Sequence, residues 1–119
     1  MIEEYKPGFM VIDGRTYQSD VETRWTGEVL DWPRQEENVL ELADIENALS
    51  EEPETIVIGT GEYGSIQVSE ELKREVLLRG IELIVDKTEQ ALKTFNVRKE
   101  ESEEEEGIQE KVIGLFHLS

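Results

Sequence analysis

Residues 55–64 read Thr55-Ile56-Val57-Ile58-Gly59-Thr60-Gly61-Glu62-Tyr63-Gly64, and this stretch decides the fold. The apolar run Thr55 to Ile58 is typical of a buried strand, and the glycines let the chain leave that strand sharply. A second apolar run, Ile81 to Val85, has the length of another buried strand. The interval between the two runs is long enough for a helix, so this part of the chain predicts a strand, a helix and a parallel strand.

The helix between these strands has clear start and stop signals. Ser69 can cap its first turn, and Gly80 stands where a helix commonly ends. Leu72, Val76 and Leu77 are predicted to face the core.

The residues before this unit predict a β-hairpin and further strands. Phe9 to Ile12 and Arg15 to Tyr17 flank Asp13-Gly14, a dipeptide that tolerates the positive φ angles of tight hairpin turns. More β character follows at Val21 and from Val29 to Trp32.

A proline separates these strands from the next helical pattern. Pro33 lacks a backbone donor and ends any ladder, and residues 34–38 are predicted to form an exposed loop. Leu42, Ile45 and Leu49 then recur at helical spacing, which indicates a short amphipathic helix.

The last third of the chain predicts a helix, an acidic loop and a final strand. Thr88 can cap a helix that ends near Asn96, because Asn tolerates the left-handed region. Residues 99–107 are rich in glutamate and lack an apolar anchor, so they are predicted to form a mobile loop. Val112 to Phe116 is the last strand, and no linker divides residues 1–119, which makes one α/β domain.

Composition restricts the classes of partner. A formal charge of −17 and a pI near 4.3 oppose binding to phosphate backbones and anionic lipids, so neither nucleic acid nor a membrane is expected as a partner. The chain has no cysteine, which excludes disulfides and thiolate chemistry. The first residues do not resemble a signal peptide or a mitochondrial presequence, and we expect a cytoplasmic protein.

The glycine stretch also matches a dinucleotide-binding pattern, with Asp86 about twenty residues beyond it. The next helix begins near Ser69 and not within the glycines, and Glu62 would repel a pyrophosphate. Two readings remain open. The glycines either serve only the chain's exit from the strand, or the Gly59 to Gly64 loop forms a ligand crevice at the strand's carboxyl end.

The side chains suited to catalysis are few. His117 is the single histidine, so a metal site with two histidines is excluded and no metal or other cofactor is predicted. A nucleophile would have to be Ser or Thr, and the chain has no Gly-x-Ser-x-Gly elbow. Carboxylates are so abundant that their spacing says nothing about acid or base catalysis.

A set of residues in this order and spacing is similar to a known family over nearly the whole chain. They are Asp13-Gly14, Tyr17, Asp20-Val21, Trp32, Ile58-Gly59-Thr60-Gly61, Gly80-Ile81, Thr88-Glu89-Gln90-Ala91, Phe95-Asn96 and Phe116-His117. The chain resembles a small-domain family of uncharacterised archaeal and bacterial proteins, which includes the human adipogenesis-associated protein and the mitochondrial respiratory complex I assembly factor. We expect an archaeal member.

The resemblance implies a three-layer α/β fold around a mixed, mainly parallel sheet, with no established reaction. It marks seven residues as candidates for a shared pocket: Trp32, Gly59, Thr60, Gly61, Thr88, Asn96 and His117. Relatives often carry a His shortly after the tryptophan and a Cys near the C-terminus. This chain has Asn38 in that loop and ends Leu118-Ser119, so chemistry that needs those side chains is not expected here.

Three functions from different classes follow, in this order. The first is a non-enzymatic protein-interaction or assembly module, as the mitochondrial relative works through protein association. The second is a small-molecule or anion-binding domain that uses the Gly59 to Gly64 loop. The third is a hydrolase or transferase with Thr60 or Thr88 beside His117 and Asn96. The enzyme question stays open, the protein partner is unidentified, and a homodimer is one of the alternatives.

Overall fold

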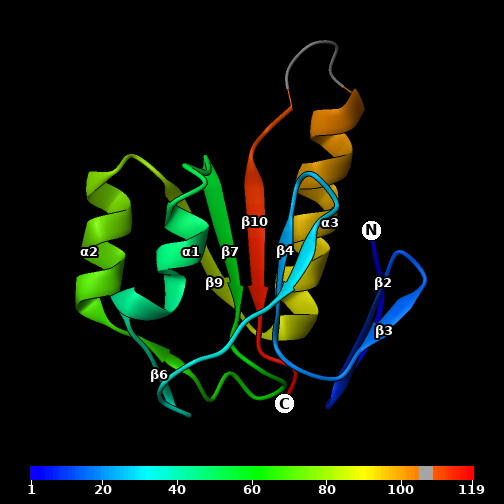
Figure 1. Ribbon diagram of the computed structural model, residues 1–119, viewed down its shortest axis with the longest axis horizontal. Helices are drawn as coiled ribbons and strands as arrows, with labels where there is room; N and C mark the ends of the chain where they lie inside the picture. Colours follow the sequence, from blue (N-terminus) through cyan, green and yellow to red (C-terminus); the bar gives the residue numbers. More distant parts are fainter. Residues whose placement is uncertain (105–108) are drawn as a thin grey trace.

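The computed structural model describes residues 1–104 and 109–119 and contains three sheets with helices around the largest of them (Figure 1). The strands are β1 (Ile2–Lys6), β2 (Phe9–Ile12), β3 (Arg15–Tyr17), β4 (Val21–Arg24), β5 (Val29–Asp31), β6 (Val39–Leu40), β7 (Thr55–Gly59), β8 (Gln67–Val68), β9 (Glu82–Asp86) and β10 (Val112–Phe116). The helices are the 3₁₀ turn η1 (Leu42–Ile45), α1 (Glu46–Leu49), α2 (Glu70–Leu78) and α3 (Thr88–Glu104).

The central sheet has five strands in the order β5-β4-β10-β7-β9 and is mixed, as predicted. β7 pairs in parallel with β10 on one side and with β9 on the other, while β4 and β5 run antiparallel at the opposite edge. In this register Gly59 lies between Phe116 and Asp86 at the carboxyl ends of three strands. The strand, helix and parallel strand expected from residues 55–85 are confirmed.

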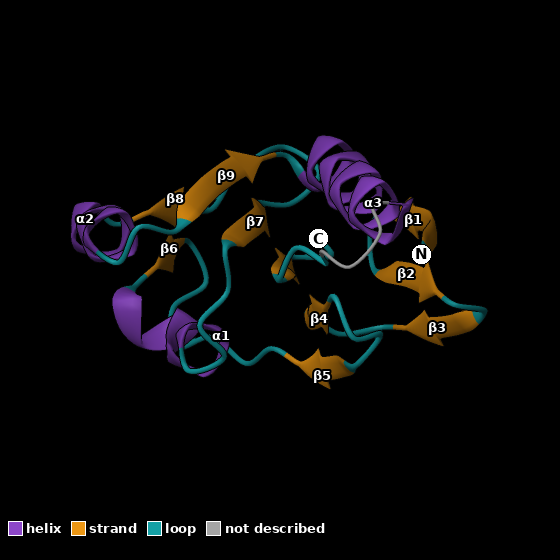
Figure 2. Cartoon of the chain, turned by 90° about the horizontal axis from the view of Figure 1, so that it is seen from above, coloured by secondary structure: helices purple, strands orange, loops and turns teal. Residues whose placement is uncertain are grey.

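Helices cover both faces of this sheet, so the fold has the three layers that the family resemblance implies. α1 and α2 lie on one face, and α3 lies on the other beside the antiparallel sheet β1-β2-β3 (Figure 2). β6 and β8 form a separate parallel pair.

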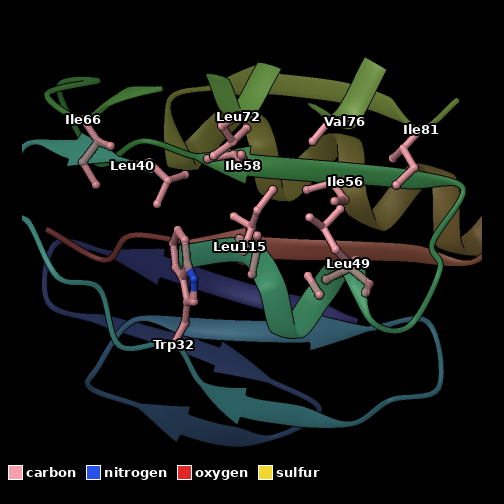
Figure 3. Packing of buried hydrophobic residues seen from close by; sticks show 13 residues of the cluster. Trp32, Leu40, Leu49, Ile56, Ile58, Ile66, Leu72, Val76, Ile81 and Leu115 are labelled. Atoms are coloured by element: carbon pink, nitrogen blue, oxygen red, sulfur yellow. The ribbon is translucent and has the colours of Figure 1, made fainter. Parts of the chain in front are cut away.

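Apolar side chains between α1, α2 and the sheet form one core. Figure 3 shows Leu72 and Val76 of α2 directed toward Ile56 and Ile58 of β7, with Leu115 of β10 beside them, and all five side chains have no exposed surface. Burial of this kind removes apolar surface from water and is the main force that holds α2 on the sheet.

A second core lies on the α3 face. Phe95 of α3 meets Phe116 of β10 edge to face, with ring centroids 6.0 Å apart and an interplanar angle of 89°. The glycine at position 114 makes room for this pair, because a Cβ there would lie 2.5 Å from the Phe116 ring and 3.0 Å from the Phe95 ring.

The N-terminal hairpin is confirmed, but another strand precedes it. Asp13 and Gly14 adopt φ angles of 48° and 81°, the conformation that a tight hairpin turn requires. β1 pairs with β2 and was not predicted, because its charged residues lack a strand's apolar alternation. Its Ile2 is held from outside the sheet by Asn96, whose amide accepts from the Ile2 nitrogen and donates to the Ile2 carbonyl, both at 2.9 Å.

Two predictions about the α2 and β9 region are wrong. Leu77 does not face the core but is 76 % exposed, because the core side of α2 is taken by Leu72 and Val76, and a residue adjacent to Val76 lies about 100° around the helix. β9 is not fully buried, since it is the edge of the central sheet and Val85 is 40 % exposed.

The start and end of α3 also differ from the prediction. Thr88 is the first residue of the helix, and its hydroxyl bonds elsewhere in the fold and does not cap the helix. Asn96 lies within the helix and not at its end, because α3 continues to Glu104. The buried Ser102 hydroxyl accepts from the Glu110 nitrogen, which anchors part of the segment predicted as an acidic mobile loop at residues 99–107. The end of that segment lies outside the described residues.

Glu52, which follows α1, is the residue where we expect a stabilising change. It adopts a φ of 51°, a left-handed conformation that strains any residue with a Cβ. We expect Glu52→Gly to raise the free energy of unfolding by about 1 kcal/mol in urea denaturation. The control is Glu46→Gly at a right-handed helical position with φ −58°, which should lower it by a similar amount. A loss of stability in Glu52→Gly would contradict the strain assigned to that position.

Within the described parts of the chain, no helix combines the length and the apolar character needed to cross a membrane.

Candidate functional site

The carboxyl ends of β7 and β10 meet the start of α3 and bring five of the predicted site residues together. They are Gly59, Thr60, Gly61, Thr88 and His117. The His117 nitrogen donates to the Gly59 carbonyl at 3.0 Å, and the Thr88 hydroxyl donates to the His117 carbonyl at 2.7 Å. The same hydroxyl accepts from the Gly61 nitrogen at 2.9 Å, so Thr88 joins the two strand ends.

Two glycines are required here because neighbouring atoms fill the space of a side chain. A Cβ on Gly59 would lie 2.9 Å from the Phe116 ring, 2.9 Å from the Thr88 hydroxyl and 3.0 Å from the Thr88 Cα. A Cβ on Gly61, at a φ of +100°, would lie 2.9 Å from the His117 ring. The glycines therefore serve close packing of three chain segments at the strand ends.

The amides of the glycine loop donate mostly inward. The Thr60 nitrogen donates to the Asp86 carbonyl at 2.9 Å, the Glu62 nitrogen to the Ser119 carbonyl at 2.6 Å, and the Ile66 nitrogen to the Thr60 carbonyl at 3.4 Å. Together with the Gly61 amide, these groups already have acceptors within the chain. A phosphate or carboxylate ligand would have to displace them, whereas anion-binding loops keep such amides free.

Three charged or ionisable side chains meet beside these strand ends, and we call them the Asp20 cluster: Asp20, Arg34 and His117. Oδ2 of Asp20 lies 2.8 Å from Nδ1 of His117 and accepts from Nε of Arg34 at 3.0 Å. The other oxygen, Oδ1, accepts from the Leu118 nitrogen at 2.9 Å. All three side chains are largely buried, with 18 % of Asp20, 10 % of Arg34 and 12 % of His117 exposed.

The carboxylate determines the tautomer of the histidine. A carboxylate only accepts, so its hydrogen bond with His117 requires a proton on Nδ1. Because a protonated Nδ1 cannot accept, Nη2 of Arg34, which lies 2.9 Å from Nδ1, donates to Asp20 and not to the ring. The other ring nitrogen, Nε2, makes no hydrogen bond with any described residue. Every unpaired side-chain nitrogen or oxygen among the described residues keeps some contact with solvent, and this includes Nε2.

Arg34 extends the Asp20 cluster to the loop that follows the second tryptophan. Its Nη1 donates to the carbonyls of Glu36 and Glu37, both at 3.1 Å, and its guanidinium lies 5.8 Å from the centre of the Trp32 ring. With its Asp20 bonds, the guanidinium is committed to internal partners. The cluster thus fastens the residues after β10 to the turn before β4 and to the loop before β6.

The two threonines do not form a nucleophile with His117. The Thr60 hydroxyl donates to the Asp86 carbonyl at 3.0 Å, and the Thr88 hydroxyl donates to the His117 carbonyl, not to its ring. No hydrogen bond among the described residues joins the His117 ring to either hydroxyl. An Asp–His pair orients a general base in many enzymes, but here no described hydroxyl stands at the free ring nitrogen.

The other two predicted site residues lie apart from this group in different ways. Trp32 is a neighbour of the Asp20 cluster through Arg34, but its indole is buried in the α1–α2 core and its Nε1 donates to the Asp44 carbonyl at 2.9 Å. Asn96 is not brought to the strand ends at all, because its amide is used to hold Ile2 of β1. Whether the seven residues bind a ligand stays a prediction.

Sequence reasoning missed two members of the cluster. The family pattern contains Asp20 without giving it a role, and the prediction of an exposed loop at residues 34–38 does not indicate that the Arg34 side chain is only 10 % exposed. One signal for Arg34 exists in the sequence, since it is the single cation between Trp32 and Asn38, a segment that also holds two glutamates.

Tyr5 of β1 approaches the same strand ends and gives a pH prediction. Burial raises the pKa of its phenol above 10.0, and the negative charge of Glu62 adds to the effect, while the Thr88 hydroxyl acts in the opposite sense. The folded chain therefore keeps this proton at a pH where the unfolded chain has lost it, so stability falls as the pH rises above about 10. We expect Tyr5→Phe to weaken that alkaline loss in urea denaturation at pH 9 to 11. At pH 7 the phenol is protonated in both the folded and the unfolded state, so this effect is absent there. If the stability of the wild type and of Tyr5→Phe fell equally steeply with pH above 10, Tyr5 would not be the source of the alkaline loss.

A second candidate surface lies beside the glycine loop along β9. Tyr63 at the tip of the loop is 81 % exposed, and Val85 of β9 is 40 % exposed. The loop and the end of β9 are close, because a Cβ on Gly64 would lie 3.4 Å from the Lys87 side chain. We call this surface the β9 edge and define it by Tyr63, Leu83 and Val85.

One hollow of the described surface lies away from both places. It has a volume of about 370 Å³ and is lined by Leu49, Glu52, Pro53, Arg79 and Ile81 at the opposite end of the sheet. Within residues 1–104 and 109–119, no three His, Asp or Glu side chains are grouped as ligands of a metal ion.

Comparison with known proteins gives a family and a fold. The model of the family described as "Protein of unknown function (DUF498/DUF598)" matches residues 2–113. None of the curated proteins matches the chain. These results supply no reaction, ligand or partner.

Solved structures share the fold over almost the full chain. A conserved hypothetical protein from Pyrococcus horikoshii is 24 % identical, with a TM-score of 0.75 over 100 % of this chain and 98 % of its own. A protein from Xanthomonas campestris is 18 % identical, with a TM-score of 0.77 over 99 % and 83 %. A Mth938-like domain from Bordetella pertussis is 18 % identical, with a TM-score of 0.68 over 98 % and 84 %. At these identities the likeness concerns the fold alone.

Proposed function

This chain belongs to the DUF498/DUF598 family of proteins of unknown function, and we propose that it serves as a protein-interaction or assembly module rather than as an enzyme. The observation that carries the proposal is the unpaired outer side of β9, next to an exposed aromatic residue. β9 is the last strand of its sheet, and Tyr63 is 81 % exposed at the neighbouring loop. Tyrosine is enriched where protein surfaces bind one another.

The backbone of β9 has hydrogen-bonding groups on its outer side that find no partner in the part of the chain that the structure describes. The Glu82 nitrogen donates to the Glu54 carbonyl, and the Asp86 carbonyl accepts from the Thr60 nitrogen, so alternate residues of β9 face β7. By the same alternation, Leu83 and Val85 direct their amides and carbonyls away from the sheet. An unprotected row of this kind is a template for a strand from another chain.

The small-molecule alternative is less well supported. The amides of Thr60, Gly61 and Glu62 already donate within the chain, so an anion at the loop would gain few free donors. A thermal-shift series with inorganic phosphate and small carboxylates tests it, because selective binding to the folded state raises its melting temperature. A rise that Thr60→Val abolishes would favour the ligand reading.

The enzyme alternative has the least support. The hydroxyls of Thr60 and Thr88 are held by backbone carbonyls, and the Arg34 guanidinium is held by Asp20 and two loop carbonyls. The Asp20 cluster is accounted for by its bonds to three chain segments, so its burial needs no catalytic explanation.

The test is comparative capture from native lysate with three forms of the chain. Val85→Pro removes the outward amide of β9 without removing a bond to β7, and it is combined with Tyr63→Ala. The matched control is Leu77→Ala with Leu78→Ala, which trims two side chains on α2 that are 76 % and 75 % exposed. We expect the wild type and the α2 control to retain the same protein at a fixed stoichiometry and the β9 variant to lose it.

Two results would count against the proposal. The first is repeated capture without a stoichiometric protein. The second is a protein that all three forms retain equally, which would move the interaction away from the β9 edge. Far-ultraviolet circular dichroism and melting curves of each variant establish that a loss of capture is not a loss of folding.

A further inference from the structure

We propose that the occupant of the β9 edge is an extended segment of a different protein that carries a Lys or Arg side chain, and not a second copy of this chain. The inference rests on the proposed function, because it specifies the partner of the same surface.

A carboxylate that no described cation neutralises lies at one end of the edge. Glu82, at the start of β9, is bound by Arg98 of α3 at 2.8 Å. At the other end, Asp86 forms no ion pair with any cation in the described parts of the chain, and its Oδ1 accepts only from the backbone nitrogen of Lys87, at 2.9 Å. Tyr63 stands next to Glu62 and is exposed. A Lys or Arg side chain placed there would meet the Asp86 carboxylate, which has no cation partner, near the exposed Tyr63 ring.

A second copy of this chain cannot supply that Lys or Arg when two β9 strands pair symmetrically with the largest number of hydrogen bonds. Two copies of β9 paired antiparallel about Ile84 would bond Leu83 of one copy to Val85 of the other. Glu82 of each copy would then lie directly opposite Asp86 of the next, and although Arg98 binds Glu82, two carboxylates would face each other across the strands, which is destabilising. If the two-fold axis lay at Leu83 instead, Val85 of one copy would pair with Ile81 of the other. The Ile81 amide is not available for this pairing, because it already donates to the Val76 carbonyl at 3.1 Å. The formal charge of −17 on each copy adds to the repulsion.

The flank of α3 offers space for side chains of an added strand. A groove of about 240 Å³ is lined by Lys93, Thr94, Val97 and Arg98, and Arg98 joins it to β9 through Glu82. Val97 is 51 % exposed there, and Figure 2 shows α3 beside β9 at this side of the molecule. An added strand directs every second side chain to this flank, so apolar residues would pack on Val97 and Ile84.

The test uses two synthetic peptides that differ only in charge. One is acetyl-Thr-Val-Lys-Val-Thr-Val-Lys-amide, and its twin has glutamate in place of both lysines. Each is titrated into the isotopically labelled full chain, and backbone amide shifts are followed by NMR at low and high salt. We expect shifts centred on Leu83 and Val85, with affinity for the lysine peptide roughly tenfold higher at low salt and a smaller ratio at high salt.

Two variants of the labelled chain assign the effect. Asp86→Asn keeps the oxygen that accepts from the Lys87 nitrogen at 2.9 Å but removes the charge, and it should reduce the preference for the lysine peptide. Val85→Pro should abolish binding of both peptides. Equal affinity of the wild type for the two peptides, shifts away from β9, or no shift with either peptide would overturn the proposal.

Sedimentation of the free chain tests whether a second copy of the chain occupies the β9 edge. A dimer that Val85→Pro dissociates would show that the edge binds a second copy, and this also overturns the inference. Failure here is distinct from failure of the proposed function. A captured protein that the β9 variant loses would still support an interaction module, even where the peptides reveal no preference for basic side chains.

Discussion

Gly59→Val is expected to lower the free energy of unfolding by about 3 kcal/mol or more, which makes it the most destabilising of the single substitutions that we propose. The added side chain would enter space held by the Phe116 ring and by the Thr88 Cα, both within 3.0 Å of the Cβ position. Because a backbone atom is among them, the neighbours cannot simply rotate away. Urea denaturation at pH 7 measures the change, and the melting temperature should fall by roughly 10 °C.

The control separates packing from backbone conformation. Gly80 has a φ of +74° and no atom within 4 Å of a Cβ position, so Gly80→Ala introduces strain without a clash and should cost about 1 kcal/mol. A double variant locates the clash. Phe116→Leu removes the ring edge, and Gly59→Ala with Phe116→Leu should be less unstable than the sum of the single changes. A melting temperature of Gly59→Val equal to that of the wild type would contradict this account of the strand ends.

Asp20→Ala is expected to have the second largest effect, a loss of about 2 to 4 kcal/mol. Removal of the carboxylate leaves the Leu118 amide without its acceptor and leaves Arg34 as a buried cation without its counter-charge. Asp20→Asn keeps an oxygen for Leu118 but not the charge for Arg34, so its loss should be smaller. Urea denaturation of the three proteins measures the order.

A matched carboxylate gives the comparison for Asp20. Asp31 is exposed and its side chain accepts, among the described residues, only from the Ser19 hydroxyl at 3.3 Å, so Asp31→Ala should change stability by less than about 0.5 kcal/mol. Hydrogen exchange of the Leu118 amide is a second measurement, and it should become faster in Asp20→Ala alone. If Asp20→Ala is as stable as Asp31→Ala, the cluster does not fasten the chain as described.

The elements that sequence reasoning found are those whose own residues carry the signal. β7 and β10 are buried at every position, so each is a continuous apolar run, and the Asp13-Gly14 turn has the dipeptide that its φ angles demand. β1 was missed because charged residues occupy most of an exposed strand. The length of α3 was missed because its last turns are anchored by the hydrogen bond that the Glu110 nitrogen donates to the Ser102 hydroxyl, which local periodicity does not reveal.

The candidate site was predictable only where one segment forms it. The glycine loop and its place at the strand end follow from residues 55–64 alone. The Asp20 cluster depends on the meeting of residues 97 positions apart in the sequence, and Arg34 is separated from His117 by 83 positions. The open side of β9 depends on which strand ends the sheet, a property of the whole topology.

Hydrogen exchange of the chain in complex with its captured protein, compared with the free chain, tests the central claim most directly. The outward amides of Leu83 and Val85 lack partners in the described fold and should exchange rapidly when the chain is free. The account predicts that the complex protects these two amides strongly while the glycine-loop amides, already bonded within the chain, change little. Protection of the glycine loop or of α2 with Leu83 and Val85 unchanged would contradict it.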